Sequence, residues 1–391
     1  MKGPRAQSRE SHELFIGPEQ SGNTRPLPCS SADGEAAAIS FTSDARSTPI
    51  MPSRRTAFTL IELLVVISII ALLIGILLPT LGGARKEAQA ARCGASIRNV
   101  GIAVQTWVSE RNQFPPAYVY GASQSGLEWR MEDQRINNPV PANGYIHWSS
   151  LLFGGEIPEG AFECPTVEDG GAPRTNPGGE PDDWEPEQVN DIGQGADGAP
   201  FPVDRQARRV AYTGNGAIFP RNKFFDEGVA RRNVLVNDAV LDRPADTILA
   251  TEFLQGRSWD TLRTPEGVIK SHRAVTPFIG ISAGTQVYSE PSSGGIPRYI
   301  YPPQSSILPS RSLGPNMIDD ANTTLNAVGR HHGGGDSDYG GAVNFVFADG
   351  HVARMTLLES VRQRLWGDRF YSMSGNNRVN VEFDLDNPSA N

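Results

Sequence analysis

The chain has 391 residues, with 35 lysines and arginines against 44 aspartates and glutamates, so its formal net charge at pH 7 is -9. This acidic balance argues against a general nucleic-acid-binding protein, which needs a basic surface to displace the counterions of the phosphates. Three cysteines are too few for a disulfide-rich scaffold, and they lack the paired spacing of a zinc site. The 41 glycines and 30 prolines predict long loops.

The N-terminal segment, residues 1–50, has no apolar periodicity and is rich in serine, glycine, proline and charged residues. A segment of this composition buries too little apolar surface to offset the entropy lost when a chain becomes ordered. We therefore predict that it is disordered.

Residues 58–78 are almost entirely apolar and contain one charged residue, Glu62. As an α-helix they would span roughly 31 Å, enough to cross the hydrocarbon core of a bilayer. Because every face is apolar, we predict a transmembrane helix rather than a helix buried in a soluble core. The main alternative is a secretory signal peptide cleaved after Ala88-Gln89-Ala90, although the apolar region of such signals is usually shorter.

Glu62 is unusual because a carboxylate inside a membrane helix costs about 3 kcal/mol on insertion scales and is usually paired. If the chain were cut before Phe58, the new α-amino group would lie one helical turn from Glu62. A neighbouring copy would then offer its amine to this carboxylate and favour side-by-side packing with a fixed axial offset. The alternative is that Glu62 extends to the membrane interface near the end of the helix.

A family resemblance is carried by the sequence Arg54-Arg55-Thr56-Ala57-Phe58-Thr59-Leu60-Ile61-Glu62. It resembles the cleavage and methylation signal of type IV prepilins and type II secretion pseudopilins. The resemblance implies that a prepilin peptidase cuts the chain between Ala57 and Phe58 and that Phe58 is then N-methylated. The family usually has glycine at the position of Ala57. It also implies that Glu62 guides assembly with other pilin or pseudopilin subunits, and that Pro79 kinks the helix.

The leader in that family is short and basic. Residues 51–57 alone fit this description, so residues 1–50 are not needed for it. We therefore expect translation to begin at Met51 and residues 1–57 to be absent from the mature chain. The resemblance further implies a single-pass protein of the inner (cytoplasmic) membrane, in contact with membrane lipid. Its C-terminal domain would then be extracytoplasmic, in the periplasm or at the cell surface. The positive charges on the two sides of the span do not decide the orientation.

Residues 79–110 continue the helical pattern as a stalk beyond the membrane. Small apolar residues recur there at helical spacing: Ala84, Ala88, Ala91, Ala95 and Ile102. We predict that this stripe packs on a β-sheet of the same chain. Pro79 and Gly82-Gly83 predict a helix that is weakened or kinked where it leaves the membrane. The helix is expected to end in the segment from Asn112 to Pro116.

The mature chain would keep two cysteines, Cys93 and Cys164. Cys93 lies about 52 Å along an unbroken helix from Phe58, beyond a hydrocarbon core of roughly 30 Å. In an oxidising exterior the two cysteines could form a disulfide, but two free thiols are the simpler expectation.

The exported domain, residues 111–391, contains an acidic segment at residues 165–204, with ten acidic residues and one basic residue, Arg174. We predict a long solvated loop there, because the segment is also rich in glycine and proline. Calcium binding is an alternative use of the acids, although the ligand order of an EF-hand is missing.

Short apolar segments of this domain predict strands at residues 210–212, 234–236 and 247–253. A β-hairpin is predicted at residues 342–356, with Asp349-Gly350 in the turn. Its first strand alternates apolar side chains on one face: Val343, Phe345 and Phe347. Thr356 and Glu359 then form a capping-box pattern that begins a short helix.

The same region is similar to the C-terminal domain of a large bacterial group of prepilin-like proteins. The similarity rests on Arg330-His331-His332-Gly333-Gly334 and on the segment from Asn344 to Val352. The hallmark of that group is a histidine, nine residues and Asp-Gly. Here 16 residues separate His332 from Asp349, because an insertion around residues 336–339 lengthens the segment.

Metal-ligating residues also gather in this region: His331, His332, His351, Asp336, Asp338 and Asp349. We nevertheless predict no metal site, because no two histidines stand four apart on a helix and the turn and strand already explain Asp349 and His351. The sequence also shows no nucleophile elbow, dinucleotide loop or phosphate-binding loop, so we predict neither an enzyme nor a cofactor.

Together these features predict an α+β protein in which a long N-terminal helix packs on an antiparallel β-sheet with long loops. The predicted function is structural: a pilin-like or pseudopilin-like subunit that assembles through its N-terminal helix into a type IV pilus or a type II secretion pseudopilus. The alternative is a membrane-anchored extracytoplasmic binding or enzymatic domain that uses the prepilin export route.

Overall fold

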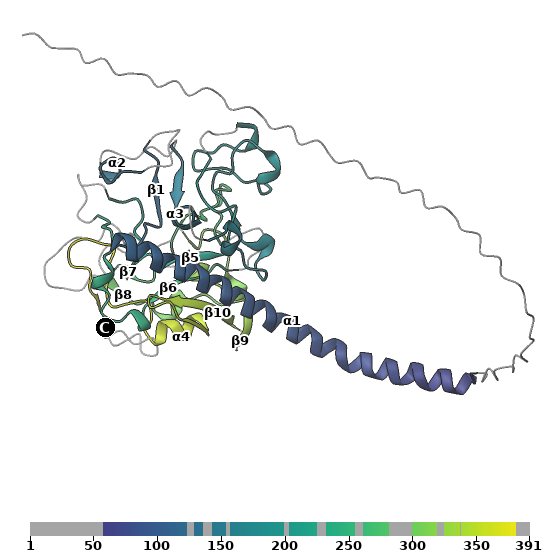
Figure 1. Cartoon of the computed structure of the whole chain (residues 1–391). Helices are drawn as coiled ribbons and strands as arrows, with labels where there is room; N and C mark the ends of the chain where they lie inside the picture. Colours follow the sequence, from purple (N-terminus) through teal and green to yellow (C-terminus); the bar gives the residue numbers. More distant parts are fainter. Residues whose placement is uncertain are drawn as a thin grey trace, which may run out of the picture. The chain divides into compact units, whose positions relative to one another are not determined.

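A computed structural model describes ten stretches of the chain (Figure 1): residues 58–122, 129–135, 143–153, 157–198, 203–224, 232–254, 261–280, 299–318, 324–336 and 338–380. The chain divides into two units, Met1–Leu63 and Leu64–Asn391. The predicted leader, residues 1–57, lies outside the described residues.

The longest element is helix α1, Leu60–Arg111, which has 52 residues. Pro79 lies inside this helix without ending it, so the membrane and stalk segments are parts of one element. Asn112 follows the helix with a φ of 55° and donates its amide to the Val108 carbonyl at 2.7 Å. Asparagine tolerates this left-handed conformation better than most residues, and it commonly follows the last helical residue.

The second unit is built on a five-stranded antiparallel sheet in the order β11-β10-β6-β5, with β9 paired to β10. Its strands are β5 Tyr212–Gly214, β6 Ile248–Glu252, β9 His332–Asp336, β10 Gly340–Phe347 and β11 Val352–Met355. Phe345 on the central strand β10 lies opposite Thr251 of β6 and Ala353 of β11. One long helix and this antiparallel sheet confirm the predicted α+β class.

Smaller elements surround the sheet. The paired strands are β1 Tyr118–Tyr120 with β2 Tyr145–His147, β3 Ala172–Pro173 with β4 Arg209–Val210, and β8 Tyr299–Ile300 with β7 Ile279–Gly280 and β12 Val379–Asn380. The β8–β12 pair is parallel and the others are antiparallel. The short helices are α2 Met131–Arg135, α3 Trp148–Phe153 and α4 Leu357–Arg362.

The two faces of the sheet are buried by different parts of the chain, because successive side chains of a strand point to opposite faces. Phe345 faces Trp366, with ring centroids 5.9 Å apart. Asn344 and Val346 face α1, where the Asn344 amide donates to the Ala90 carbonyl at 3.2 Å. Helix α1 therefore covers one face of β10, as Figure 1 shows from the side.

The face of α1 that packs on the domain differs from the predicted one. Its buried residues are Ala90, Cys93, Ile97, Val100, Gly101, Ala103, Val104 and Val108. The predicted stripe is exposed instead, including Ile102 at 52%. Both sets follow the helical period, but the buried set contains larger branched side chains, whose burial removes more apolar area from water. The prediction that the alanine stripe packs on the sheet is therefore wrong.

Gly101 allows α1 to approach the sheet closely. A Cβ atom at this position would lie 2.5 Å from Val346 Cγ2. One turn further along, the Gln105 amide donates to the Ala348 carbonyl. The missing side chain of Gly101 thus lets the helix backbone lie directly against β10.

We expect Gly101→Val to destabilise the full-length chain by about 1–3 kcal/mol, because it forces extra atoms into a packed interface. Gly82→Val is the matched control, since nothing lies within 4 Å of a Cβ at Gly82. The measurement is thermal unfolding in detergent, followed by near-ultraviolet circular dichroism. Equal midpoints for the two variants would show that helix and sheet do not pack this closely.

The C-terminal hairpin and the helix after it follow the sequence pattern. Strands β10 and β11 are joined by a turn in which Gly350 has a φ of 90°. Thr356 caps α4: its hydroxyl accepts the Glu359 amide at 3.1 Å, and the Glu359 carboxylate accepts the Thr356 amide at 2.7 Å.

The other strand predictions had mixed outcomes. The segment at residues 247–253 contains β6, and residues 210–212 overlap the end of β4 and the start of β5. Residues 234–236 form no regular strand. The Val234 amide donates to the Ser372 carbonyl, and the Val236 carbonyl accepts from Phe114, so this segment bonds to two separate parts of the chain. Strand β9 was not predicted, because its glycines give no apolar alternation.

The acidic segment is more ordered than a solvated loop. Strand β3 pairs with β4, and buried polar residues include Thr175, Gln188 and Asp204. The Asp204 carboxylate accepts the Tyr145 amide and the Asn176 amide, each at 2.8 Å. The composition of the segment does not show that backbone amides and basic side chains elsewhere in the chain bind its carboxylates. Calcium binding by these residues is only the weaker alternative, and none of these contacts tests it.

Candidate functional site

The start of α1 holds the residues of the expected processing and assembly site. Phe58 and Thr59 precede the first helical residue, and Ala57 lies outside the described residues. Glu62 Oε2 accepts hydrogen bonds from the Thr59 amide and the Thr59 hydroxyl, both at 2.8 Å. The Glu62 amide donates to Thr59 Oγ1 at 3.2 Å. These reciprocal bonds form a capping box, in which Thr59 is the N-cap of α1.

The capping box gives Glu62 a local role that the sequence prediction missed. The signal was present, because Thr59 and Glu62 have the same spacing as Thr356 and Glu359. An ionised carboxylate has about four acceptor positions, so a cap that uses two of them leaves capacity for an ammonium group. The geometry therefore allows Glu62 both to begin the helix and to bind a cation.

The N-terminal half of α1 has an apolar surface. Large side chains along it are exposed, including Leu72 at 65% and Ile76 at 60%. Among the described residues, α1 is the one helix long and apolar enough to cross a membrane, and none of its most apolar stretch is buried against the rest of the chain. Pro79 follows this stretch within the same helix.

Cys93 and Cys164 form a disulfide, with an S–S distance of 1.96 Å and 5.1 Å between the Cα atoms. Both residues are fully buried. Cys93 lies on the buried face of α1, and Cys164 precedes a short 3-10 turn at Glu168–Gly170. Of the two alternatives that the sequence left open, the structure has the disulfide, which joins the stalk part of α1 to the domain that follows it.

The six metal-ligating residues considered in the C-terminal sequence do not converge. His351 Nδ1 lies 2.6 Å from Asp349 Oδ1 on the exposed hairpin turn. Asp338 pairs with Arg311 at 3.0 Å on the surface, and the side chain of Asp336 lies outside the described residues. Asp349 and Gly350 shape the turn.

His331 and His332 instead lie beside Glu252, the last residue of β6. Glu252 Oε2 is 3.2 Å from His331 Nε2 and 2.8 Å from His332 Nε2. Burial raises the pKa of the Glu252 carboxyl, but the two adjacent imidazoles outweigh burial and lower the pKa to about 2. Glu252 could not be identified from the sequence, because no local motif links it to histidines so far away in the chain.

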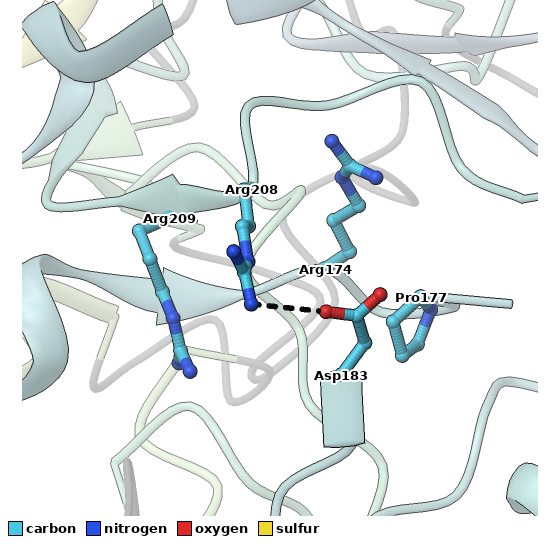
Figure 2. A pocket seen from close by; sticks show the side chains of 5 residues that line it. All are labelled: Arg174, Pro177, Asp183, Arg208 and Arg209. Carbon is cyan, nitrogen blue, oxygen red and sulfur yellow. Dashed lines mark hydrogen bonds and ion pairs between the residues drawn. The ribbon is translucent and has the colours of Figure 1, made fainter. Parts of the chain in front are cut away.

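Arginine side chains line a cavity of about 150 Å³ in the acidic region (Figure 2). Its lining residues are Arg174, Pro177, Asp183, Arg208 and Arg209. Arg208 pairs with Asp183 at 3.1 Å, as the dashed line in Figure 2 shows. Arg174 pairs with Glu159 and Arg209 with Glu185. Because all three guanidinium groups have carboxylate partners, the cavity lacks the excess positive charge of an anion site.

Comparison with known protein families identifies the N-terminal segment. Residues 52–78 match the model of the prokaryotic N-terminal methylation motif. They carry a prepilin-type signal. The signal includes Ala57, Phe58 and Glu62, and the exposed apolar surface of α1 continues from it. The match and the apolar helix that follows together fit a membrane anchor with a prepilin-type processing signal.

The remaining comparisons add no relatives. No curated protein and no solved structure matches the chain. The prepilin-type match ends at residue 78 and does not extend to the C-terminal resemblance around residues 330–352, which stays a prediction.

Proposed function

We propose that the chain is a structural pilin-like or pseudopilin-like subunit. A prepilin peptidase cuts it between Ala57 and Phe58, and the mature chain assembles through α1 into a type IV pilus or a type II secretion pseudopilus. Its partners are the peptidase and other subunits with the same kind of N-terminal helix. The observation that carries the proposal is the prepilin-type signal at residues 52–78.

The geometry at the start of α1 supports this function. Cleavage before Phe58 would place a positively charged amine next to Thr59, one turn before Glu62. In a low-dielectric membrane, an unpaired amine or carboxylate is costly, so each charge favours an opposite charge nearby. A neighbouring helix shifted along its axis provides that charge, and the apolar surface of α1 provides the packing contact.

The disulfide supports an extracytoplasmic position for the domain after α1. Disulfides form and persist in oxidising compartments, and they are rare in the cytoplasm. With the N-terminus in the cytoplasm, a single span places Cys93 and Cys164 on the far side of the membrane.

The proposal is tested by native electrophoresis and chemical cross-linking of membranes from cells with and without an active prepilin peptidase. We expect a multi-subunit complex or a sheared filament fraction only when the peptidase is active. Without the peptidase, the uncleaved precursor should remain dispersed in the membrane. A cleaved chain that stays monomeric would refute the assembly function. It would favour a tethered binding or enzymatic domain, for which the large exported domain and its cavity provide space.

A further inference from the structure

A buried cluster lies on the face of the central sheet that α1 covers. It consists of Glu252 at the end of β6, His331 before β9, and His332 at the start of β9. The side chains are 0%, 5% and 1% exposed, respectively. The Cys93–Cys164 disulfide is adjacent: its sulfurs, a Glu252 oxygen and a His332 nitrogen all lie within 4.8 Å of one another.

The contacts within the cluster do not complete ordinary hydrogen bonds. Both His331 Nε2 and His332 Nε2 point to Glu252 Oε2, at 3.2 and 2.8 Å. Neither ring nitrogen has a hydrogen-bond partner of good geometry, and neither does His331 Nδ1. Buried polar atoms are satisfied in most proteins, and exceptions often mark an ion or a water. Several unsatisfied nitrogens beside one buried carboxylate therefore call for a shared partner.

The distances fit a metal ion as that partner. Zinc binds imidazole nitrogen and carboxylate oxygen at about 2.0–2.2 Å. Two ligands about 2.1 Å from one ion lie about 3.0 Å apart at an octahedral angle of about 90°, and about 3.4 Å apart at the tetrahedral angle that zinc prefers. The two nitrogen–oxygen distances of the cluster bracket the first value and are a few tenths of an ångström shorter than the second, so small shifts of the side chains would admit an ion. Two imidazoles that each carried a proton on Nε2 could both donate to Glu252 Oε2, but neither ring nitrogen has the alignment that such a hydrogen bond requires.

The Glu252 carboxylate is oriented by a hydrogen bond to its second oxygen, as metal-binding carboxylates usually are. Asn344 of β10 donates its side-chain amide to Glu252 Oε1 at 2.8 Å, which leaves Oε2 facing the histidines. The same amide group donates to the Ala90 carbonyl of α1 at 3.2 Å. Hydrogen bonds of this kind orient metal ligands and raise the affinity of the site.

We propose that Glu252, His331 and His332 bind one divalent cation of the zinc class, with the neighbouring disulfide intact. The donor set is two imidazoles and a carboxylate, which suits zinc and similar transition metals better than calcium or magnesium. The ion would join β6, β9 and the segment between them beneath α1. The sulfurs of the disulfide are not ligands in this site, because a thiolate is needed to bind a metal.

The test uses the full-length chain, purified in detergent without added metal or reductant. We expect elemental analysis to find about one equivalent of a zinc-class metal, or calorimetry to find uptake of about one equivalent of Zn²⁺ after treatment with a chelator. With Co²⁺, visible d–d bands should appear without a sulfur-to-cobalt charge-transfer band. Near-ultraviolet circular dichroism checks that the protein stays folded.

The variants Glu252→Gln, His331→Gln and His332→Gln, each of which replaces a ligand with a neutral amide, should each weaken Zn²⁺ binding by at least about tenfold. His351→Gln is the matched control, since it changes an exposed histidine that pairs with a carboxylate, and it should leave binding unchanged. Absence of metal and of Zn²⁺ uptake in the folded chain would overturn the proposal, and the cluster would then be a proton-bridged ion pair. Uptake only after reduction would also overturn it, because Cys93 and Cys164 would then be ligands.

Discussion

Glu62→Ala is expected to leave the chain in the membrane but to prevent its assembly. Removing a carboxylate from the span favours insertion by about 3 kcal/mol, so the anchor should be retained. Assembly would lose the partner of a buried amine, and breaking one side of a buried ion pair costs about 3–5 kcal/mol. This corresponds to a loss of roughly a hundredfold or more in association. The measurement is the fraction of the chain in the complex or filament after membrane fractionation.

The capping box makes a sharper comparison possible, because Glu62 has two separable roles. Glu62→Gln keeps a residue that can cap Thr59 but removes the charge. Thr59→Ala removes the cap, at a cost of about 1 kcal/mol, but keeps the charge. We expect Glu62→Gln to fail in assembly and Thr59→Ala to assemble. The reverse pattern would show that Glu62 acts by starting the helix rather than by binding an amine.

Removal of the disulfide is expected to have the largest effect on the stability of the domain that follows α1. Cys93 and Cys164 are separated by 71 residues. Closing a loop of this length stabilises the folded state by about 4 kcal/mol in the chain-entropy model. The double variant Cys93→Ala, Cys164→Ala should therefore have a markedly lower free energy of unfolding in detergent. Alanine is used in place of serine because it adds no hydroxyl group to the buried site.

A reductant provides the control for this prediction. It should lower the thermal midpoint of the wild-type chain toward that of the double variant and should leave the double variant itself unchanged. Trapping of free thiols on the chain in intact cells gives a second readout. Unchanged stability of the double variant would show that the stalk is held to the domain by packing alone.

Several elements could be predicted because their signals are local. The membrane segment is a continuous apolar sequence, and the hairpin at residues 342–356 combines alternation with a turn residue that takes a positive φ. The cap of α4 follows from two residues with fixed spacing. In each case, neighbouring residues alone determine the structure.

The remaining features depend on residues that are distant in sequence. Which face of α1 is buried depends on the side chains of β10 that contact the helix, such as Val346 beside Gly101. The acidic segment is ordered by partners outside it, such as Lys270, which pairs with Asp191 at 2.8 Å. Glu252 meets His331 only because β6 and the segment before β9 come together in the fold. Periodicity and spacing carry no information on such contacts.

The central claim is that a prepilin peptidase processes this chain before Phe58 and that the apolar helix remains attached. The most direct measurement is the intact mass and N-terminal peptide of the mature protein purified from its own membranes. We predict a chain that begins at Phe58 and carries one methyl group on its α-amino nitrogen. A mature chain that begins at Ala91, or one that keeps residues before Phe58, would contradict the account.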